Sequence, residues 1–128
     1  MTDLDSYALD HGIDVFYDAI PETMAMAVPG ALCLDWSLLA CPAARSVCLA
    51  HELGHVETGA FYTRDASGLD RRRAELRADR WAIRHLISRE DLLAALRSGV
   101  SSPWDLAERF SLPEPLIREA LSLYLVCR

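Results

Sequence analysis

Two histidines and a glutamate occur together in the segment "CLAHELGHVETG", residues 48–59. His51 and His55 are four residues apart, and Glu52 directly follows the first of them. On an α-helix four residues advance about 400° and about 6 Å, so both imidazole rings would project from the same face. Two rings so placed can bind one ion at about 2.0–2.1 Å each, and zinc is the ion that this H-E-x-x-H pattern indicates.

Glu52 has the residue type and the position of a general base. It lies about 100° around the helix from His51, beside the metal rather than on it. A carboxylate there can take a proton from a metal-bound water and later pass it to a leaving amine. The spacing therefore predicts Glu52 as the catalytic residue of a hydrolase.

The same three residues could instead be ordinary helix surface. The surrounding residues disfavour this, because "VCLA" before the motif and "LG" within it are small and apolar, as in a buried helix. Gly54 also costs about 1 kcal/mol relative to alanine inside a helix. Its presence predicts that another backbone or a substrate passes close to this point.

A catalytic zinc site has three protein ligands and one open position, so a third ligand must come from another segment. Glu75 is the best candidate, because it follows the second histidine of the motif by 20 residues, on the next predicted helix. Asp79 lies one turn further on the same face, where it could accept the free ring N–H of His51. The segment "RRRAELRADR" could also be a salt-bridged helix surface, with pairs such as Glu75 and Arg71. The two histidines outside the motif are weaker candidates for the third ligand: His11 and His85.

H-E-L-G-H followed 20 residues later by E-x-x-A-D resembles the glutamate-zincins. The combination of "LAHELGHVETGAFYTRD" with "ELRADRWAIRHLI" is more closely similar to the ImmA/IrrE family of metallopeptidases, over about residues 10–125. This resemblance implies a minimal zincin-like fold and a cytoplasmic zinc protease. The family is common in bacterial prophages and mobile elements, and its members often act on a repressor encoded beside them.

By matching positions, the resemblance implies that His51, His55 and Glu75 are the zinc ligands and that Glu52 is the general base and acid. Asp79 falls where the family commonly carries Asp or Asn, which implies a role behind the metal ligands. From its length of 128 residues, the chain is expected to leave no room for an additional DNA-binding or sensor domain of the kind that larger relatives carry.

Other residues could contribute to such a site. The tetrahedral intermediate of peptide hydrolysis needs a hydrogen-bond donor, and Tyr62 or Arg64 in the loop after the motif could supply it. Zincins hold their substrate in extended form along an edge strand, and residues 31–35, "ALCLD", are the candidate. Cys48 could join the metal as a fourth ligand, which would close the site, but a small buried thiol is the favoured interpretation.

The fold class expected from the pattern is α+β, in one domain over residues 1–128. Residues 1–40 are predicted to hold a short helix over 4–10 and a strand in "GIDVFYDAI" that ends at Pro21. Two further strands, "MAMAV" and "ALCLD", flank a Pro-Gly turn. These strands should form a small antiparallel sheet packed on the active-site helix.

Residues 42–88 are predicted to contain the two zinc-binding helices, the first running from Pro42 to a stop at Gly59 and the second opening on Asp70 as its N-cap. Residues 89–128 form a helical C-terminal part, with a helix over about 89–98 that Gly99 ends. The segment "LAERFSLPEPLIREALSLY" has the rhythm of a helix-turn-helix. Its last helix offers Glu114, Arg118 and Glu119, a poor complement to phosphate, so we interpret it as a packing helix pair.

The composition of the chain restricts its partners. Its 128 residues are 52% hydrophobic and 25% charged, as in a globular protein. The net charge of −6 argues against nucleic acid as the main partner. No apolar run has the length of a membrane span, and the acidic N-terminus is unlike a secretory signal. The four cysteines form no C-x-x-C pair and are expected to be reduced and mostly buried, in a cytoplasm: Cys33, Cys41, Cys48 and Cys127.

The function expected from these patterns is that of a zinc metallo-endopeptidase that cleaves an intracellular protein, with a phage or mobile-element repressor of the helix-turn-helix type as one candidate substrate. Two alternatives stay open. The chain could be a zincin-scaffold binding protein with little turnover, such as a toxin-antitoxin or anti-repressor partner, or it could hold a closed structural zinc. The cleavage site, the activation trigger and the oligomeric state carry no sequence signal.

Overall fold

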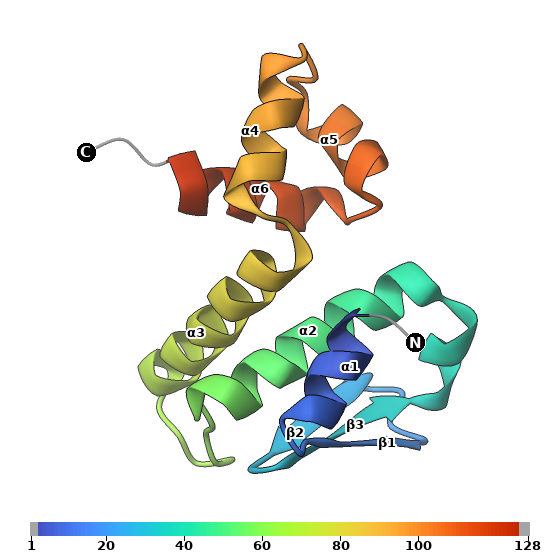
Figure 1. The fold of residues 1–128 in the computed structure, drawn as a ribbon. Coiled ribbons are helices and arrows are strands. Elements are labelled where there is room, and N and C mark those ends of the chain that lie inside the picture. Colours follow the sequence, from blue (N-terminus) through green and yellow to red (C-terminus); the bar gives the residue numbers. More distant parts are fainter. Residues whose placement is uncertain (1–2, 126–128) are drawn as a thin grey trace. The chain divides into compact units, whose positions relative to one another are not determined.

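A computed structural model describes residues 3–125, which form six α-helices, one short 3-10 helix and three β-strands (Figure 1). The α+β class predicted from the sequence is confirmed. The chain divides into two compact units, Met1–Ala82 and Ile83–Arg128, and the candidate motif lies wholly in the first. The single domain predicted from the chain length stays a prediction.

The sheet of the first unit has three strands in the order β1-β3-β2: β1 is Asp14–Asp18, β2 is Ala25–Val28 and β3 is Ala31–Asp35. β2 and β3 are antiparallel and joined by a two-residue turn, with Gly30 at φ +82°, as the Pro-Gly signal predicted. β1, however, pairs with β3 in parallel. The sheet is therefore mixed, and the prediction of a wholly antiparallel sheet is wrong. The reason is that β2 takes the far edge, so β3 returns between its two predecessors in the direction of β1.

Helix α2, Pro42–Thr58, lies along one face of this sheet (Figure 1). It begins at Pro42 and ends at Gly59, whose φ of +67° is left-handed, so both predicted ends are confirmed. Hydrophobic burial holds the helix on the sheet, because leucines of both elements are almost wholly excluded from solvent. These are Leu32 and Leu34 of β3 and Leu49 and Leu53 of α2.

An arginine of α2 ties the N-terminal helix α1, Asp3–Asp10, to the sheet. Arg45 donates to both carboxylate oxygens of Asp5, at 2.6 and 3.1 Å, and to the Tyr17 hydroxyl of β1 at 2.8 Å. The forked geometry of the guanidinium suits two acceptors at once. These hydrogen bonds connect α1 and β1 to α2, the helix that carries the motif. Between the sheet and α2 the chain forms the short 3-10 helix η1, Trp36–Ala40, which Asp35 caps by accepting from the Ser37 backbone N–H at 3.0 Å.

Helix α3, Gly68–Leu86, begins two residues before the predicted start. The Ser67 hydroxyl accepts a hydrogen bond from the Asp70 backbone N–H at 3.1 Å, so the serine caps the helix. The prediction of Asp70 as the N-cap is therefore wrong. Serine and aspartate are both favoured N-cap residues, so the sequence alone does not distinguish Ser67 from Asp70, and the path of the loop determines which of them caps the helix.

α3 crosses α2 at Gly54. A Cβ atom built on Gly54 would lie 2.5 Å from the carbonyl oxygen of Ala78 and 2.9 Å from its Cα. The two backbones can approach this closely only where α2 has no side chain. The predicted close approach is confirmed, and it brings the turn of α3 that carries Glu75 and Asp79 beside the motif.

The second unit contains α4, Arg89–Arg97, α5, Pro103–Phe110, and α6, Glu114–Leu125. Ser88 and Ser102 cap α4 and α5, and α4 ends just before Gly99, as predicted. α5 packs against α6, which agrees with the interpretation of a packing helix pair. A hydrophobic cluster holds this unit together, with the following residues at its centre: Ile83, Ile87, Leu92, Leu106 and Ile117.

Two further predictions concern cysteines and membranes. Cys33, Cys41 and Cys48 are free thiols, as expected, but none is fully buried, because they lie on the outer sheet face, at a helix junction and at a cleft. Cys127 lies outside the described residues. Within residues 3–125, no helix combines the length and the apolar character that crossing a bilayer requires.

Candidate metal centre

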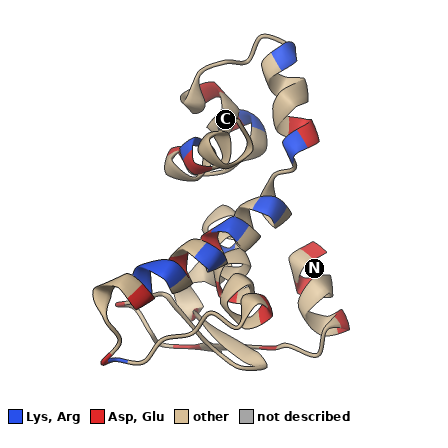
Figure 2. Ribbon diagram, turned by 90° about the vertical axis from the view of Figure 1, so that its left-hand side faces the viewer, with Lys and Arg blue, Asp and Glu red and all other residues tan. Residues whose placement is uncertain are grey.

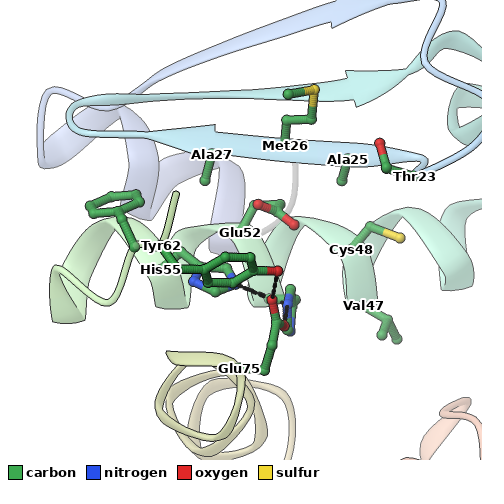
Figure 3. Close-up of a pocket in the computed structure, with 12 residues that line it drawn as sticks. Thr23, Ala25, Met26, Ala27, Val47, Cys48, Glu52, His55, Tyr62 and Glu75 are labelled. Carbon is green, nitrogen blue, oxygen red and sulfur yellow. Dashed lines mark hydrogen bonds and ion pairs between the residues drawn. The ribbon is translucent and has the colours of Figure 1, made fainter. Parts of the chain in front are cut away.

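His51 and His55 project from the same face of α2, as the spacing predicted. Their Nε2 atoms lie 3.2 Å apart, and the His55 side chain is buried while His51 is a quarter exposed. Glu75 of α3 completes the group (Figure 3). Its Oε2 lies 2.7 Å from Nε2 of His51, and its Oε1 lies 3.3 Å from Nε2 of His55. Among residues 3–125 this is the one group of three or more His, Cys, Asp or Glu side chains that lie close enough together to hold a metal ion.

The hydrogen bonds behind the two rings fix which nitrogen is available. His55 Nδ1 lies 2.6 Å from the carbonyl oxygen of Ala60, which can only accept, so Nδ1 carries the hydrogen and Nε2 presents a lone pair. His51 Nδ1 lies 2.8 Å from Oδ1 of Asp79, so the contact predicted for Asp79 is present. Acceptors of this kind commonly orient metal-binding histidines.

The donor set fits a zinc ion. Ligands at about 2.05 Å around a tetrahedral ion are about 3.3 Å from one another. The two Nε2 atoms are 3.2 Å apart, and the contact of His55 with Oε1 of Glu75, at 3.3 Å, is likewise close to that value. The contact of His51 with Oε2 of Glu75 is shorter, at 2.7 Å, as in a direct hydrogen bond. When both Nε2 atoms are deprotonated, three groups present lone pairs to one point, and a cation between them removes their mutual repulsion. The arrangement therefore suits a bound divalent ion with three protein ligands.

The charge around His51 favours a cation. Burial of the ring lowers its pKa, but the hydrogen bond to Asp79 and the negative charges of Asp79, Glu75 and Glu52 outweigh it and raise the pKa to about 9. At neutral pH, without metal, this ring is therefore protonated. A metal ion would replace that proton as the positive charge of the site.

Glu52 lies in the same cleft, outside the group of three donors (Figure 3). Only 8% of it is exposed. Burial raises the pKa of its carboxyl group, and the neighbouring His51 and His55 partly oppose this rise. A carboxyl group whose pKa is raised toward neutrality is suited to both accepting and donating a proton.

Of the two loop residues predicted as substrate contacts, Tyr62 is at the site. Its hydroxyl donates to Oε1 of Glu75 at 2.8 Å, and its ring lies edge-on to that of His55 at 6.4 Å. Arg64 is exposed and does not line the cleft, so the structure does not bring its side chain to the metal group. The turn after α2 directs one of these neighbouring side chains inward and the other outward.

Arg71 is a residue that the sequence interpretation missed. It was considered as an ion-pair partner for Glu75, but its guanidinium lies over the Tyr62 ring, 5.5 Å from the centroid. It also donates to the carbonyl oxygens of Ala66, at 3.3 Å, and of Arg64. Arg71 thus holds the loop that carries Tyr62 against the first turn of α3. The position of Arg71 in the first turn of α3, directly after this loop, was the sequence feature that could have predicted a contact with the loop.

A cleft of about 560 Å³ opens over the metal group, between α2, α3 and strand β2. The predicted substrate strand, residues 31–35, is β3, the central strand with partners on both sides, so that prediction is wrong. β2 is the edge strand that borders the cleft. All three of Ala25, Met26 and Ala27 line the cleft, and Figure 3 shows the Met26 side chain on the opposite side of β2 from those of Ala25 and Ala27.

The register of β2 determines which of its backbone groups are open. The Asp35 backbone N–H donates to the Met24 carbonyl at 2.8 Å, so Met24 and Asp35 occupy a hydrogen-bonding position of the ladder, although the Met24 N–H donates to Ile20. Such pairs alternate along an antiparallel ladder. Met26 therefore bonds to β3, while the N–H and C=O groups of Ala25 and Ala27 point to the free edge. Two small residues thus leave room above the metal group and expose backbone hydrogen-bonding groups beside it.

The remaining candidates lie outside the metal group. His11 stacks on Tyr7 near the N-terminus, and His85 is an exposed residue of the second unit. Cys48 lines the cleft, but it is not one of the grouped donors, and burial raises the pKa of its thiol. Glu57, the other acidic residue near the end of α2, accepts a hydrogen bond from Tyr7 and is not one of the grouped donors. The three-donor site with an open side is thus the arrangement present.

The comparison with known families agrees with this geometry. The Peptidase_M78 family, described as the IrrE N-terminal-like domain, matches residues 40–122, about two thirds of the chain. The chain belongs to this family. The match includes all three grouped donors and Glu52, and it confirms the resemblance to ImmA/IrrE proteins found in the sequence. No curated protein and no solved structure matches the chain significantly. Membership of Peptidase_M78 supports a metallopeptidase that acts on a protein substrate.

Proposed function

We propose that this Peptidase_M78 member is a zinc-dependent endopeptidase that hydrolyses a peptide bond in an intracellular protein. The observation that carries the proposal is the convergence of His51, His55 and Glu75, from two helices, beside the buried carboxyl group of Glu52. The free thiols of the described cysteines fit a reducing compartment such as the bacterial cytoplasm. A repressor encoded near the protease is the finer candidate for the substrate.

In this proposal, His51, His55 and Glu75 hold the zinc ion through two Nε2 atoms and a carboxylate. When bound, zinc lowers the pKa of a water ligand to about 7 and polarises the substrate carbonyl. Asp79 and the Ala60 carbonyl hold the two rings in the orientation that directs Nε2 at the ion. Both histidines are thus positioned before substrate arrives.

Glu52 is the proposed proton carrier. Its carboxylate takes a proton from the attacking water and delivers it to the nitrogen of the scissile bond, which leaves as an amine. Burial raises the pKa of Glu52 and so brings its proton affinity closer to those of the attacking water and of the leaving amine. No other carboxylate lines the cleft among the described residues, apart from Glu75.

We further propose that the substrate binds β2 as an added strand. The outward N–H and C=O groups of Ala25 and Ala27 would pair with the substrate backbone, as in other proteins that extend a sheet edge. The Tyr62 hydroxyl, which donates to Glu75 in this structure, is the proposed partner of the developing oxyanion. Arg71 would act through Tyr62 by positioning its loop.

The test uses purified protein mixed with the products of its neighbouring genes, with and without chelator. The wild type with zinc should produce fragments that chelation abolishes. Glu52→Gln should bind zinc with unchanged stoichiometry but produce no fragments, whereas His55→Ala should lose both. Cleavage retained by pure Glu52→Gln protein would refute the mechanism, and a stable complex without fragments would favour the binding protein that the sequence left open.

A further inference from the structure

The exposed side of α3 carries a row of arginines and leucines. Positions 69, 73, 76 and 80 repeat at the spacing of one helix face, and positions 72 and 77 flank it. Figure 2 shows the basic residues following one another along α3, and five of the 13 arginines of the chain fall within residues 71–80. We call this surface the arginine stripe. It consists of Leu69, Arg72, Arg73, Leu76, Arg77 and Arg80, all exposed.

The four arginines of the stripe have no partner within the described residues. None of them takes part in an ion pair or a side-chain hydrogen bond there, unlike Arg45, Arg71 and Arg118. Two of the three acidic residues of the same helix, Glu75 and Asp79, contact the histidines of the metal group. The third, Asp70, is exposed in the first turn, so the stripe carries four arginines beside one carboxylate. The chain as a whole carries a net charge of −6. The stripe is therefore a local cationic surface on an anionic protein.

The two leucines of the stripe distinguish between kinds of anionic partner. Leu69 is 51% exposed and Leu76 is 44% exposed, and they alternate with the arginines along the face. A phosphate backbone offers little to cover them, whereas an acidic peptide with apolar side chains can bury both leucines and pair with the arginines. The net negative charge of the chain also disfavours a nucleic acid, because the negative field of a phosphate backbone extends beyond the stripe and would repel the rest of the protein.

We propose that the arginine stripe is a docking site for an acidic segment of the protein substrate, one that carries apolar side chains between its carboxylates. That the docked protein is a substrate rests on the proposed function, but the binding itself does not require cleavage. Because the stripe and Glu75 share one rigid helix, a protein docked there is held beside the cleft. Electrostatic attraction to such a surface raises the rate of encounter and selects among partners.

The experiment measures binding of a fluorescein-labelled peptide of repeated Glu-Glu-Leu units by fluorescence anisotropy. The Glu52→Gln protein is used so that turnover cannot contribute. The triple variant Arg73→Gln, Arg77→Gln, Arg80→Gln should bind on the order of tenfold more weakly. Leu76→Ser should also weaken binding. Added salt that shortens the Debye length to about 3–5 Å should weaken peptide binding by the parent protein much more than binding by the triple variant.

A matched control removes the same charge elsewhere. Arg89, Arg97 and Arg109 are exposed residues of α4 and α5, and their triple change to Gln should leave peptide binding within about twofold of the parent protein. Polyglutamate without leucine, a Gln-Gln-Leu peptide and a labelled DNA duplex should each bind more weakly than the Glu-Glu-Leu peptide.

Three outcomes would overturn the proposal. Equal binding by the parent protein and the stripe triple variant would show that the stripe is not the docking site. DNA that binds as tightly as the peptide would make it a nucleic-acid surface, and indifference to Leu76→Ser together with equal binding of polyglutamate would make it a generic polyanion surface. Cleavage assays of the wild type test the proposed function separately, so a failure of either proposal can be told from a failure of the other.

Discussion

Gly54→Ala should damage the metal centre without altering any residue that faces it. The added Cβ would lie 2.5 Å from the carbonyl oxygen of Ala78, whereas ordinary contacts begin at 3.4 Å. The α3 backbone would therefore have to move away from α2 by about 0.9 Å, the difference between these two distances. Glu75 precedes Ala78 by three residues, about 4.5 Å along the helix axis, so Glu75 would move together with Ala78.

The displacement is large for a metal site, because ligand distances are normally held to about ±0.2 Å. Zinc affinity should fall at least about tenfold, as for loss of a supporting contact. Stability responds to two opposed effects. Overpacking costs about 1–3 kcal/mol, while alanine improves helix propensity by about 1 kcal/mol. The metal-free variant should thus be destabilised by about 0–2 kcal/mol relative to the parent protein.

The assays are competition with a chromophoric zinc chelator and thermal unfolding followed by circular dichroism. Gly68→Ala is the matched control, since it makes the same chemical change in α3 and its added Cβ would meet nothing within 4 Å. Gly68→Ala should keep zinc affinity and be neutral or slightly stabilising. A Gly54→Ala protein that binds zinc like the wild type and unfolds at a higher temperature would refute the reasoning, because helix propensity alone would then explain position 54.

Four further outcomes are expected. Asp79→Asn should reduce zinc affinity by about 10- to 100-fold and leave the metal-free fold intact, as measured by chelator competition and circular dichroism; unchanged affinity would contradict the positioning role. Because His51 has a pKa of about 9 without metal, zinc binding below that pH should release about one proton, seen by calorimetry in buffers of different ionisation enthalpy, and affinity should rise with pH. The raised pKa also means that His51 stabilises the metal-free fold below its ordinary value of 6.5 and that this contribution is lost as pH rises through about 9, which chemical denaturation at several pH values would detect. Ala27→Pro removes an N–H that points away from β3, so the protein should fold but show a higher KM, whereas Met26→Pro should disrupt the sheet itself; normal KM in Ala27→Pro would argue against strand addition.

Much of the site was determined by the sequence alone. The geometry of a helix is local, so the four-position spacing of His51 and His55 suffices to place both rings on one face. Pro42, Gly59 and the Pro-Gly turn before β3 likewise act on their immediate neighbours, and the ends they predicted are where the structure has them. Gly54 predicted a close approach through its cost to the helix, although not the identity of the backbone that approaches.

The tertiary structure decided the relations between segments. Strand signals do not specify neighbours, since pairing depends on the path of the intervening chain; hence β1 is parallel to β3, and β2 rather than β3 borders the cleft. Loops lack periodicity, so only the folded turn shows that Tyr62 points inward and Arg64 outward. The position of Glu75 is intermediate: its spacing suggested a ligand, but the packing of Ala78 against Gly54 brings its carboxylate to the histidines. Local rules place side chains on an element, and only packing places one element against another.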